Sequence, residues 1–312
     1  NRTSMATIDL TDTSGAAPVG GDNIALPYLV HGTDISGRLV RLGTTVQDIV
    51  DVHRYPRPIA ALLAEASALA AAMASSLKFD GKLILQTQSD GPVTMLVADV
   101  TTDGALRGYV QFDEARYAAL GMHDFRSLLG KGYIAFTVDQ GQYAERYQGI
   151  VDLDGGNLAE CIEHYFAQSD QVDMAVRTAA DIDREGRWRA GAILAQRLPE
   201  IGGQGEVADS DAASEAWNRA LAFLGSVRPG ELTDPTLEGE TLLYRLFHED
   251  GVRVTTTQHL RHACQCSEDR LRTVLLSLSA DELADCFVDG RVSSTCEFCN
   301  TTYAFTPEDL DV

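Results

Sequence analysis

In the N-terminal part of the chain, hydrophobic residues follow two periods, and each period predicts one kind of element. Residues 57–77 are rich in Ala and Leu, with neither Gly nor Pro after the first turn, which predicts a long, largely buried helix. Beyond it come short runs rich in β-branched and aromatic residues, separated by Thr, Asp and Gly. These runs predict strands at residues 82–88, 93–100, 105–112, 132–139 and 145–153. The combination predicts an α+β domain in which helices pack on an antiparallel sheet.

Two further elements are expected before the pattern breaks. Residues 157–168 start with Asn157 at a helix-capping position and continue with apolar residues at helical spacing. Cys161 lies on that apolar face, so we interpret it as a small buried residue of the core. Residues 187–198 predict one more strand of the same sheet.

The composition changes at Pro199, which predicts a linker. From Pro199 to Glu240 the chain holds six Gly, three Pro and nine acidic residues against two Arg. A helix is expected within this segment at residues 212–224, followed by a second helix at residues 240–250. The first helix carries an apolar stripe made of Ala213, Trp217, Leu221 and Leu224. Such a stripe indicates that the linker helix packs on another surface.

Four cysteines near the C-terminus lie in two closely spaced pairs. Cys264 and Cys266 form a CxC pair, Cys296 and Cys299 form a CxxC pair, and 29 residues separate the pairs. Two such pairs can converge on one ion, and four thiolates suit a tetrahedral Zn²⁺ site. The same sulfurs could instead form two short-range disulfides, so both states stay open. For the reduced protein we predict one zinc ion per chain.

Three other residues near this motif are candidates for a role in it. His259 and His262 are close enough in sequence to replace a ligand, but four sulfurs already complete a structural zinc site. We therefore expect both histidines beside the site or on the surface. Cys286 lies in the apolar run LADCFV and is expected in the core.

Charge and composition limit the classes of partner. The 312 residues contain 25 Lys and Arg against 46 Asp and Glu, a net charge of −21, which repels nucleic acids and anionic membrane surfaces. Uninterrupted apolar stretches long enough to span a membrane are not found, and the first residues do not read as a secretory signal. We therefore expect a cytoplasmic protein, whose thiols stay reduced and available for metal.

The cysteine motif disfavours enzyme chemistry. A closed four-thiolate zinc site lacks the open position that a catalytic zinc keeps for water, which disfavours a hydrolase. A dithiol oxidoreductase should have its CxxC at the start of a helix after a strand, whereas Cys296 follows the turn-like sequence GRVSST. We predict that the protein is not an enzyme.

The size of the C-terminal segment predicts what loss of the metal does. Residues 251–312 are about 60 residues, a marginal size for a domain without a metal or covalent cross-link. Structural zinc contributes about 10–16 kcal/mol of apparent binding free energy, whereas disulfides across one or two residues constrain little chain. Exchange of zinc for disulfides should therefore unfold this segment and release a linker helix that rests on it.

The chain resembles the heat shock protein 33 family, the redox-regulated bacterial holdases also called redox-regulated chaperonins. The resemblance covers nearly the whole chain and includes the segments LKFDG at 77–81, DGP at 90–92, residues 146–171, residues 242–250, CQC and CEFCNTTYAF. One departure is Asn300, where the family pattern has Gly after the CxxC pair. Because Asn tolerates the left-handed backbone conformation, we expect the turn to be intact.

The resemblance implies a redox-regulated, ATP-independent chaperone that holds unfolding client proteins under oxidative stress. It implies that oxidation releases zinc, forms the disulfides Cys264–Cys266 and Cys296–Cys299, unfolds the linker and yields a homodimer. It also implies three parts: an N-terminal client-binding and dimerisation domain (residues 1–198), a metastable linker (199–250) and a C-terminal zinc-binding switch domain (251–312). The alternative is a constitutive binding or adaptor module in which zinc is purely structural.

Overall fold

The structure is a computed structural model that describes residues 8–9, 21–77, 80–140, 147–170, 172–198 and 210–310. Contacts within the chain divide it into two compact units, Asn1–His262 and Ala263–Val312. Residues 199–209, the start of the predicted linker, lie outside the described residues. The functional division at residues 198 and 250 stays a prediction. The mixed α+β class that the sequence predicted is confirmed.

The first unit contains two sheets. The first sheet holds, in spatial order, β1 (Ile8–Asp9), β11 (Val252–Val254), β2 (Ile24–Val30), β3 (Ile35–Leu42), β10 (Trp188–Arg197) and β9 (Met174–Ile182), and β12 (Gln258–His259) also pairs with β2. All its pairings are antiparallel. Strand β10, which lies between β3 and β9, is almost continuously apolar because both faces of this sheet are covered.

The second sheet is built from the strands that the alternating runs predicted. Its order is β13 (Arg261–His262), β6 (Ala105–Phe112), β5 (Val93–Thr101), β4 (Lys82–Ser89), β7 (Gly132–Asp139) and β8 (Tyr147–Asp152). It is antiparallel apart from the parallel pair of β13 and β6. The expectation that residues 187–198 join this sheet is wrong, because β10 pairs with β3 and β9. The hydrophobic pattern identifies a strand but not its partner.

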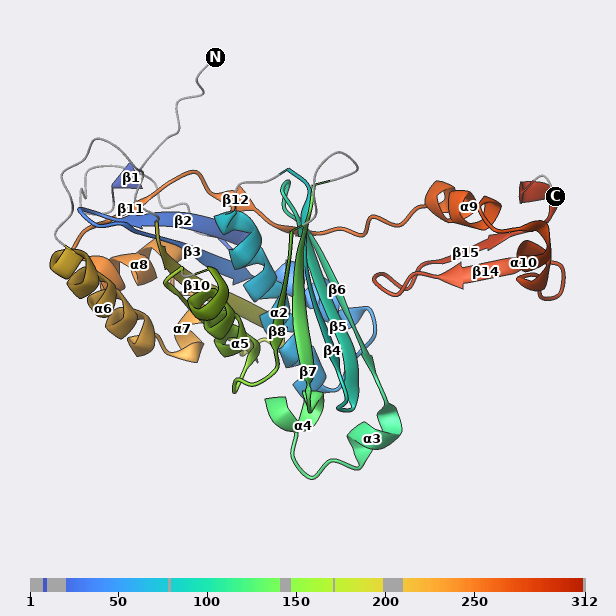
Figure 1. Ribbon diagram of the computed structural model, residues 1–312, viewed down its shortest axis with the longest axis horizontal. Coiled ribbons are helices and arrows are strands. Elements are labelled where there is room, and N and C mark those ends of the chain that lie inside the picture. The colour runs from blue at the N-terminus through green and yellow to red at the C-terminus, as the bar shows by residue number, and fades with distance from the viewer. Residues whose placement is uncertain are drawn as a thin grey trace, which may run out of the picture. The chain divides into compact units, whose positions relative to one another are not determined.

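Helix α2 (Arg57–Ser76) lies between the two sheets and forms the centre of the main core (Figure 1). Its many alanines allow close approach to strands on both sides, and nearly every position from Ile59 to Ala74 is buried. The helix is long and apolar enough to cross a membrane, but 78% of its most apolar window is buried inside the structure. It is therefore a core helix.

Shorter helices surround this core. They are α1 (Thr44–Asp51), α3 (Glu114–Ala118), α4 (Phe125–Leu129) and α5 (Leu158–Tyr165), which continues into the π-helical turn η1 (Phe166–Asp170). The predicted cap of α5 is confirmed, since the Asn157 side chain accepts a hydrogen bond from the backbone N–H of Glu160 at 2.9 Å.

The predicted linker helices pack on the other face of the first sheet (Figure 1). The two predicted helices are α6 (Ser210–Ser226) and α8 (Gly239–Phe247), and a short helix that was not predicted, α7 (Pro229–Thr233), lies between them in sequence. The buried side of α6 consists of Ala216, Trp217, Ala220 and Leu224. Part of the predicted stripe is therefore wrong, because Leu221 is exposed and the buried face is rotated toward Ala216 and Ala220.

Aromatic contacts join these helices to the sheet. The ring of Phe247 in α8 lies 5.5 Å from the ring of Tyr28 in β2 and 5.9 Å from that of Phe223 in α6. Tyr28 donates a hydrogen bond to the Leu194 carbonyl at 3.0 Å. A side chain at Gly37 would collide with the Tyr28 ring, so this glycine makes room for it. The covered face is thus a second apolar core formed by sheet and linker together.

The second unit is small. It contains α9 (Glu268–Leu276), α10 (Ala280–Asp285), the antiparallel hairpin of β14 (Val292–Thr295) and β15 (Thr302–Phe305), and the 3₁₀ turn η2 (Glu308–Leu310). Its buried apolar residues are Leu275, Leu283, Val292, Phe305 and Leu310. A core of this size supplies little stability without a further constraint.

Candidate metal centre

The four cysteines of the two predicted pairs come together in the second unit. Their Sγ atoms all lie within 4.8 Å of one another. Two contacts cross between the pairs, at 3.6 Å from Cys264 Sγ to Cys296 Sγ and at 3.3 Å from Cys266 Sγ to Cys299 Sγ. All four cysteines are partly buried thiols, and none of them is in a disulfide. The convergence that the sequence predicted is therefore present.

The CxC pair is held by the start of α9. Ser267 caps the helix by accepting a hydrogen bond from the backbone N–H of Arg270. The Arg270 side chain in turn donates to the carbonyl of Gln265, between the two cysteines, at 2.8 Å. These two contacts fix the backbone conformation of the segment that carries Cys264 and Cys266.

The CxxC pair lies in the turn between β14 and β15. The Cys296 N–H donates to the Thr301 carbonyl at 2.9 Å, and the Asn300 N–H donates to the Cys296 carbonyl at 2.8 Å. Asn300 has φ 56°, the left-handed conformation expected there from the sequence. The tight turn places both thiols on the side facing the CxC pair.

Two hydroxyl groups contact the sulfur cluster. The Tyr303 hydroxyl lies 3.3 Å from Cys266 Sγ, and the Thr301 hydroxyl lies 3.3 Å from Cys299 Sγ. Sequence reasoning did not single out either residue, although both lie within the CEFCNTTYAF motif. Both residues follow Cys299 closely on a tight hairpin, and this spacing could have identified them as neighbours of the sulfurs.

The thiols ionise unequally. Burial raises the pKa of Cys266 to about 12 and also raises the pKa of Cys296. Burial also opposes ionisation of Cys299, but hydrogen bonds with Thr301 and with the neighbouring sulfurs outweigh it and lower its pKa to about 7. Four close thiols cannot all ionise without a compensating positive charge. A divalent cation would supply that charge and replace the protons.

The sulfur spacing fits a tetrahedral thiolate site. With metal–sulfur bonds of about 2.3 Å, tetrahedral geometry places sulfurs about 3.8 Å apart, close to the spacing here. The four cysteines could therefore hold a metal ion.

The remaining candidates lie apart from the cluster. Cys161 is buried in the main core, as predicted, and burial raises its pKa. Cys286 is exposed, so its predicted place in the core is wrong. The reason is its position at the end of α10, where Leu283 and not Cys286 faces the small core.

The two histidines belong to the first unit. His259 is exposed in β12, and His262 pairs with Leu106 through β13. Burial lowers the pKa of His262, and its Nε2 atom has no hydrogen-bond partner within the part of the chain that the structure describes. Neither histidine is among the clustered ligand atoms.

Comparison with known proteins identifies a protein family and similar chains. The family model described as Hsp33 protein matches residues 23–306. A 33 kDa chaperonin of Caulobacter vibrioides (strain NA1000 / CB15N) is 42% identical over 294 residues, which cover 92% of this chain and 95% of that protein. A 33 kDa chaperonin of Ectopseudomonas mendocina (strain ymp) is 37% identical over 285 residues, covering 91% and 92%.

A solved structure has the same fold. The crystal structure of the 33 kDa chaperonin (heat shock protein 33 homolog) of Thermotoga maritima has a TM-score of 0.75 with 23% sequence identity. The match covers 93% of this chain and 97% of that one.

Proposed function

The chain belongs to the Hsp33 family, and from this premise we propose that it is an ATP-independent holdase whose four-cysteine site is a redox switch. Family membership supports a chaperone function, and a chaperone of this family binds unfolded client proteins. The observation that carries the switch is the convergence of four cysteine sulfurs in a unit with a very small core.

In the reduced state, Cys264, Cys266, Cys296 and Cys299 hold one Zn²⁺ per chain. Four thiolates in tetrahedral spacing favour zinc, which needs no open position in a structural site. When bound, the ion keeps the sulfurs deprotonated and contributes about 10–16 kcal/mol of apparent binding free energy, comparable to the whole stability of a small domain. The second unit therefore depends on the ion for its fold.

Oxidation removes this support. Hydrogen peroxide takes two electrons from each cysteine pair, and the products are the disulfides Cys264–Cys266 and Cys296–Cys299 and water. Disulfide sulfur is a poor zinc ligand, so the ion leaves. Each disulfide closes a loop too short to replace the stability that the zinc supplied.

The linker helices α6, α7 and α8 are the element that this change releases. The chain reaches Cys264 through β11, β12 and β13, which pair with β2 and β6 and follow α8 directly. Loss of order after Cys264 weakens these short pairings first. Release of the helices would uncover the apolar face of the first sheet, including Leu26, Tyr28, Leu39 and Ile193. That face is the surface we assign to client binding.

The expectations for oligomeric state, location, partners and enzyme activity are also part of this proposal. The activated chain forms a homodimer, acts in the cytoplasm, uses no nucleic acid or membrane partner, and is not an enzyme. The net charge of −21 supports solubility while apolar surface is exposed.

Client protection before and after oxidation tests the function. Light scattering of a thermally unfolding client is measured with the reduced, zinc-loaded chain and with the same chain after peroxide treatment and removal of the peroxide. We expect strong suppression of aggregation only after oxidation. Equal activity in both states would indicate the alternative, a constitutive binding module with structural zinc. A chain inactive in both states would contradict the holdase itself.

A further inference from the structure

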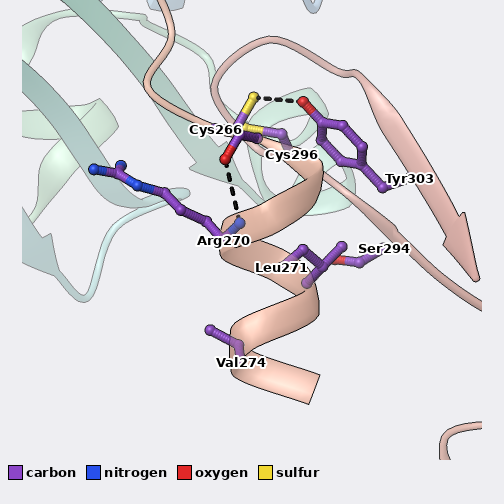
Figure 2. Close-up of a pocket in the computed structure, with 8 residues that line it drawn as sticks. Cys266, Arg270, Leu271, Val274, Ser294, Cys296 and Tyr303 are labelled. Atoms are coloured by element: carbon purple, nitrogen blue, oxygen red, sulfur yellow. Dashed lines mark hydrogen bonds between the residues drawn. The ribbon is translucent and has the colours of Figure 1, made fainter. Parts of the chain in front are cut away.

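A cavity of about 220 Å³ opens beside the sulfur cluster of the second unit (Figure 2). One cysteine of each pair lines it, Cys266 and Cys296, whereas Cys264 and Cys299 do not. The other lining residues come from α9 and from the hairpin of β14 and β15: Ser267, Arg270, Leu271, Val274, Ser294 and Tyr303. Since a water molecule takes about 30 Å³, the cavity has room for a small organic molecule.

Most of the cavity wall is apolar. Leu271 and Val274 are one helical turn apart on α9 and both line the cavity, and Leu271 points toward Ser294 of β14 (Figure 2). Tyr303 also lines the cavity, and its hydroxyl contacts Cys266 Sγ (Figure 2). Val274 is 58% exposed, so the apolar wall is accessible from solvent.

Hydrogen peroxide gains nothing from such a wall. Hydrogen peroxide is small and well hydrated. Only the apolar surface of a molecule gains free energy when it moves from water onto an apolar wall, and hydrogen peroxide has no such surface. A hydroperoxide with a hydrocarbon body does gain, because Leu271 and Val274 can cover that body while the peroxide group meets sulfur. Arg270 also lines the cavity, and its positive charge disfavours cationic molecules.

We propose that this cavity binds organic hydroperoxides and directs them to Cys266 and Cys296, so that the switch responds to apolar oxidants as well as to hydrogen peroxide. The inference rests on the proposed redox switch and specifies which oxidants reach it.

The chemistry at the cavity is a two-electron oxidation. The sulfur of Cys266 or Cys296 attacks the terminal oxygen of the hydroperoxide. An S–O bond forms, the O–O bond breaks, and the alkoxide leaves and takes a proton from solvent to become an alcohol. The partner cysteine of the same pair then attacks the sulfenic acid, which forms the disulfide and releases water.

The test changes the apolar wall without touching a ligand or the core. Val274→Asp introduces a charge at an exposed position of the cavity, and Val274→Leu keeps the wall apolar. The control is Val288→Asp, because Val288 is 71% exposed in the same unit and does not line the cavity. Rate constants for zinc release and thiol loss are measured for the full zinc-loaded chain with cumene hydroperoxide and with hydrogen peroxide. Mass spectrometry locates the first sulfenic acid with a dimedone label.

We expect Val274→Asp to slow the reaction with cumene hydroperoxide about tenfold, the loss expected for one apolar side-chain contact, and to leave the hydrogen peroxide rate nearly unchanged. Val274→Leu and Val288→Asp should keep the original ratio of the two rates, and the label should appear first on Cys266 or Cys296. The cavity assignment would be overturned if Val274→Asp left the ratio of the two rate constants unchanged, or if dimedone first labelled Cys264 or Cys299. Failure of hydrogen peroxide to release zinc from the unaltered chain would instead overturn the redox switch.

Discussion

Single side chains around the sulfur cluster determine how it responds to metal and to oxidant. Thr301 and Tyr303 contact two of the four sulfurs, and Asn300 supplies the left-handed turn that brings Cys299 toward the CxC pair. Hydrogen bonds to ligand sulfur orient the ligand and moderate its reactivity. The site therefore consists of more than its four ligands.

Replacement of one ligand should remove the metal. In Cys264→Ser, three thiols remain, and we expect less than one zinc per chain and loss of the cooperative unfolding of the second unit, because zinc contributes about 10–16 kcal/mol there. Zinc analysis and thermal unfolding followed by circular dichroism measure both effects. The matched control is Cys286→Ser, since Cys286 is exposed and outside the cluster. A full zinc content in Cys264→Ser would rule out the assigned ligand set.

Glu65 gives the first unit a pH dependence. Its side chain, on α2, accepts a hydrogen bond from the Thr178 hydroxyl at 3.2 Å, and burial raises the pKa of its carboxyl group. A carboxyl group with a raised pKa in the folded state makes folding more favourable below its ordinary pKa, and this contribution is lost as the pH rises through the folded-state value.

Glu65→Gln should therefore raise the free energy of unfolding at neutral pH. The gain should shrink as the pH falls to the ordinary pKa of glutamate, about 4, and vanish below it, where the native side chain is protonated in both states. Denaturant unfolding of the first unit at several pH values measures this difference. A stabilisation that does not vary with pH would show that the charge of Glu65 is not its cause.

Among the elements, the linker is held to the sheet by apolar packing and by one buried cation. Arg41 of β3 is buried beneath the linker and donates hydrogen bonds to the carbonyls of Leu237, at 2.6 Å, and Asp234. Burial lowers the pKa of the Arg41 guanidinium, and the nearby acidic groups of Asp234 and Glu240 oppose that shift. Arg41 therefore fixes the loop between α7 and α8.

Loss of this contact should loosen the linker. Arg41→Met leaves two part-buried carbonyls without their donor, and we expect the linker to be destabilised by about 1–3 kcal/mol. Client protection should then begin at a lower peroxide dose. The matched control, Arg57→Met, removes an exposed arginine whose partner is the exposed Asp181. An identical dose response in Arg41→Met and Arg57→Met would show that Arg41 does not restrain the linker.

The sequence predicts elements better than their partners. Helix α2, the strands of the second sheet and the capped helix α5 follow from local pattern, and the cysteine pairs converge as their spacing predicts. The place of β10 in the first sheet depends on pairing with β3, which local periodicity does not encode. Leu221 and Cys286 have apolar neighbours in sequence but are exposed to solvent. A helix turns only one side toward the core, so some residues of an apolar run remain on its other side.

Across the molecule, stability is distributed very unevenly between the two units. The first unit has two extensive cores on the two faces of one sheet, whereas the second has a handful of buried apolar residues and the cysteine cluster. Loss of the metal therefore removes much of the stability of the second unit and little of the first. This difference would let one chemical event change a limited part of the chain while the sheet that we propose binds clients stays folded.

Hydrogen exchange with mass spectrometry tests this coupling most directly. Protection of backbone amides is measured in the reduced, zinc-loaded chain and after peroxide has removed four thiols and one zinc per chain. The account predicts that amides of α6 and α8 lose protection after oxidation, together with those of the second unit, while those of β4, β5 and β7 keep theirs. Unchanged protection of α6 and α8 after complete oxidation and zinc release would contradict it.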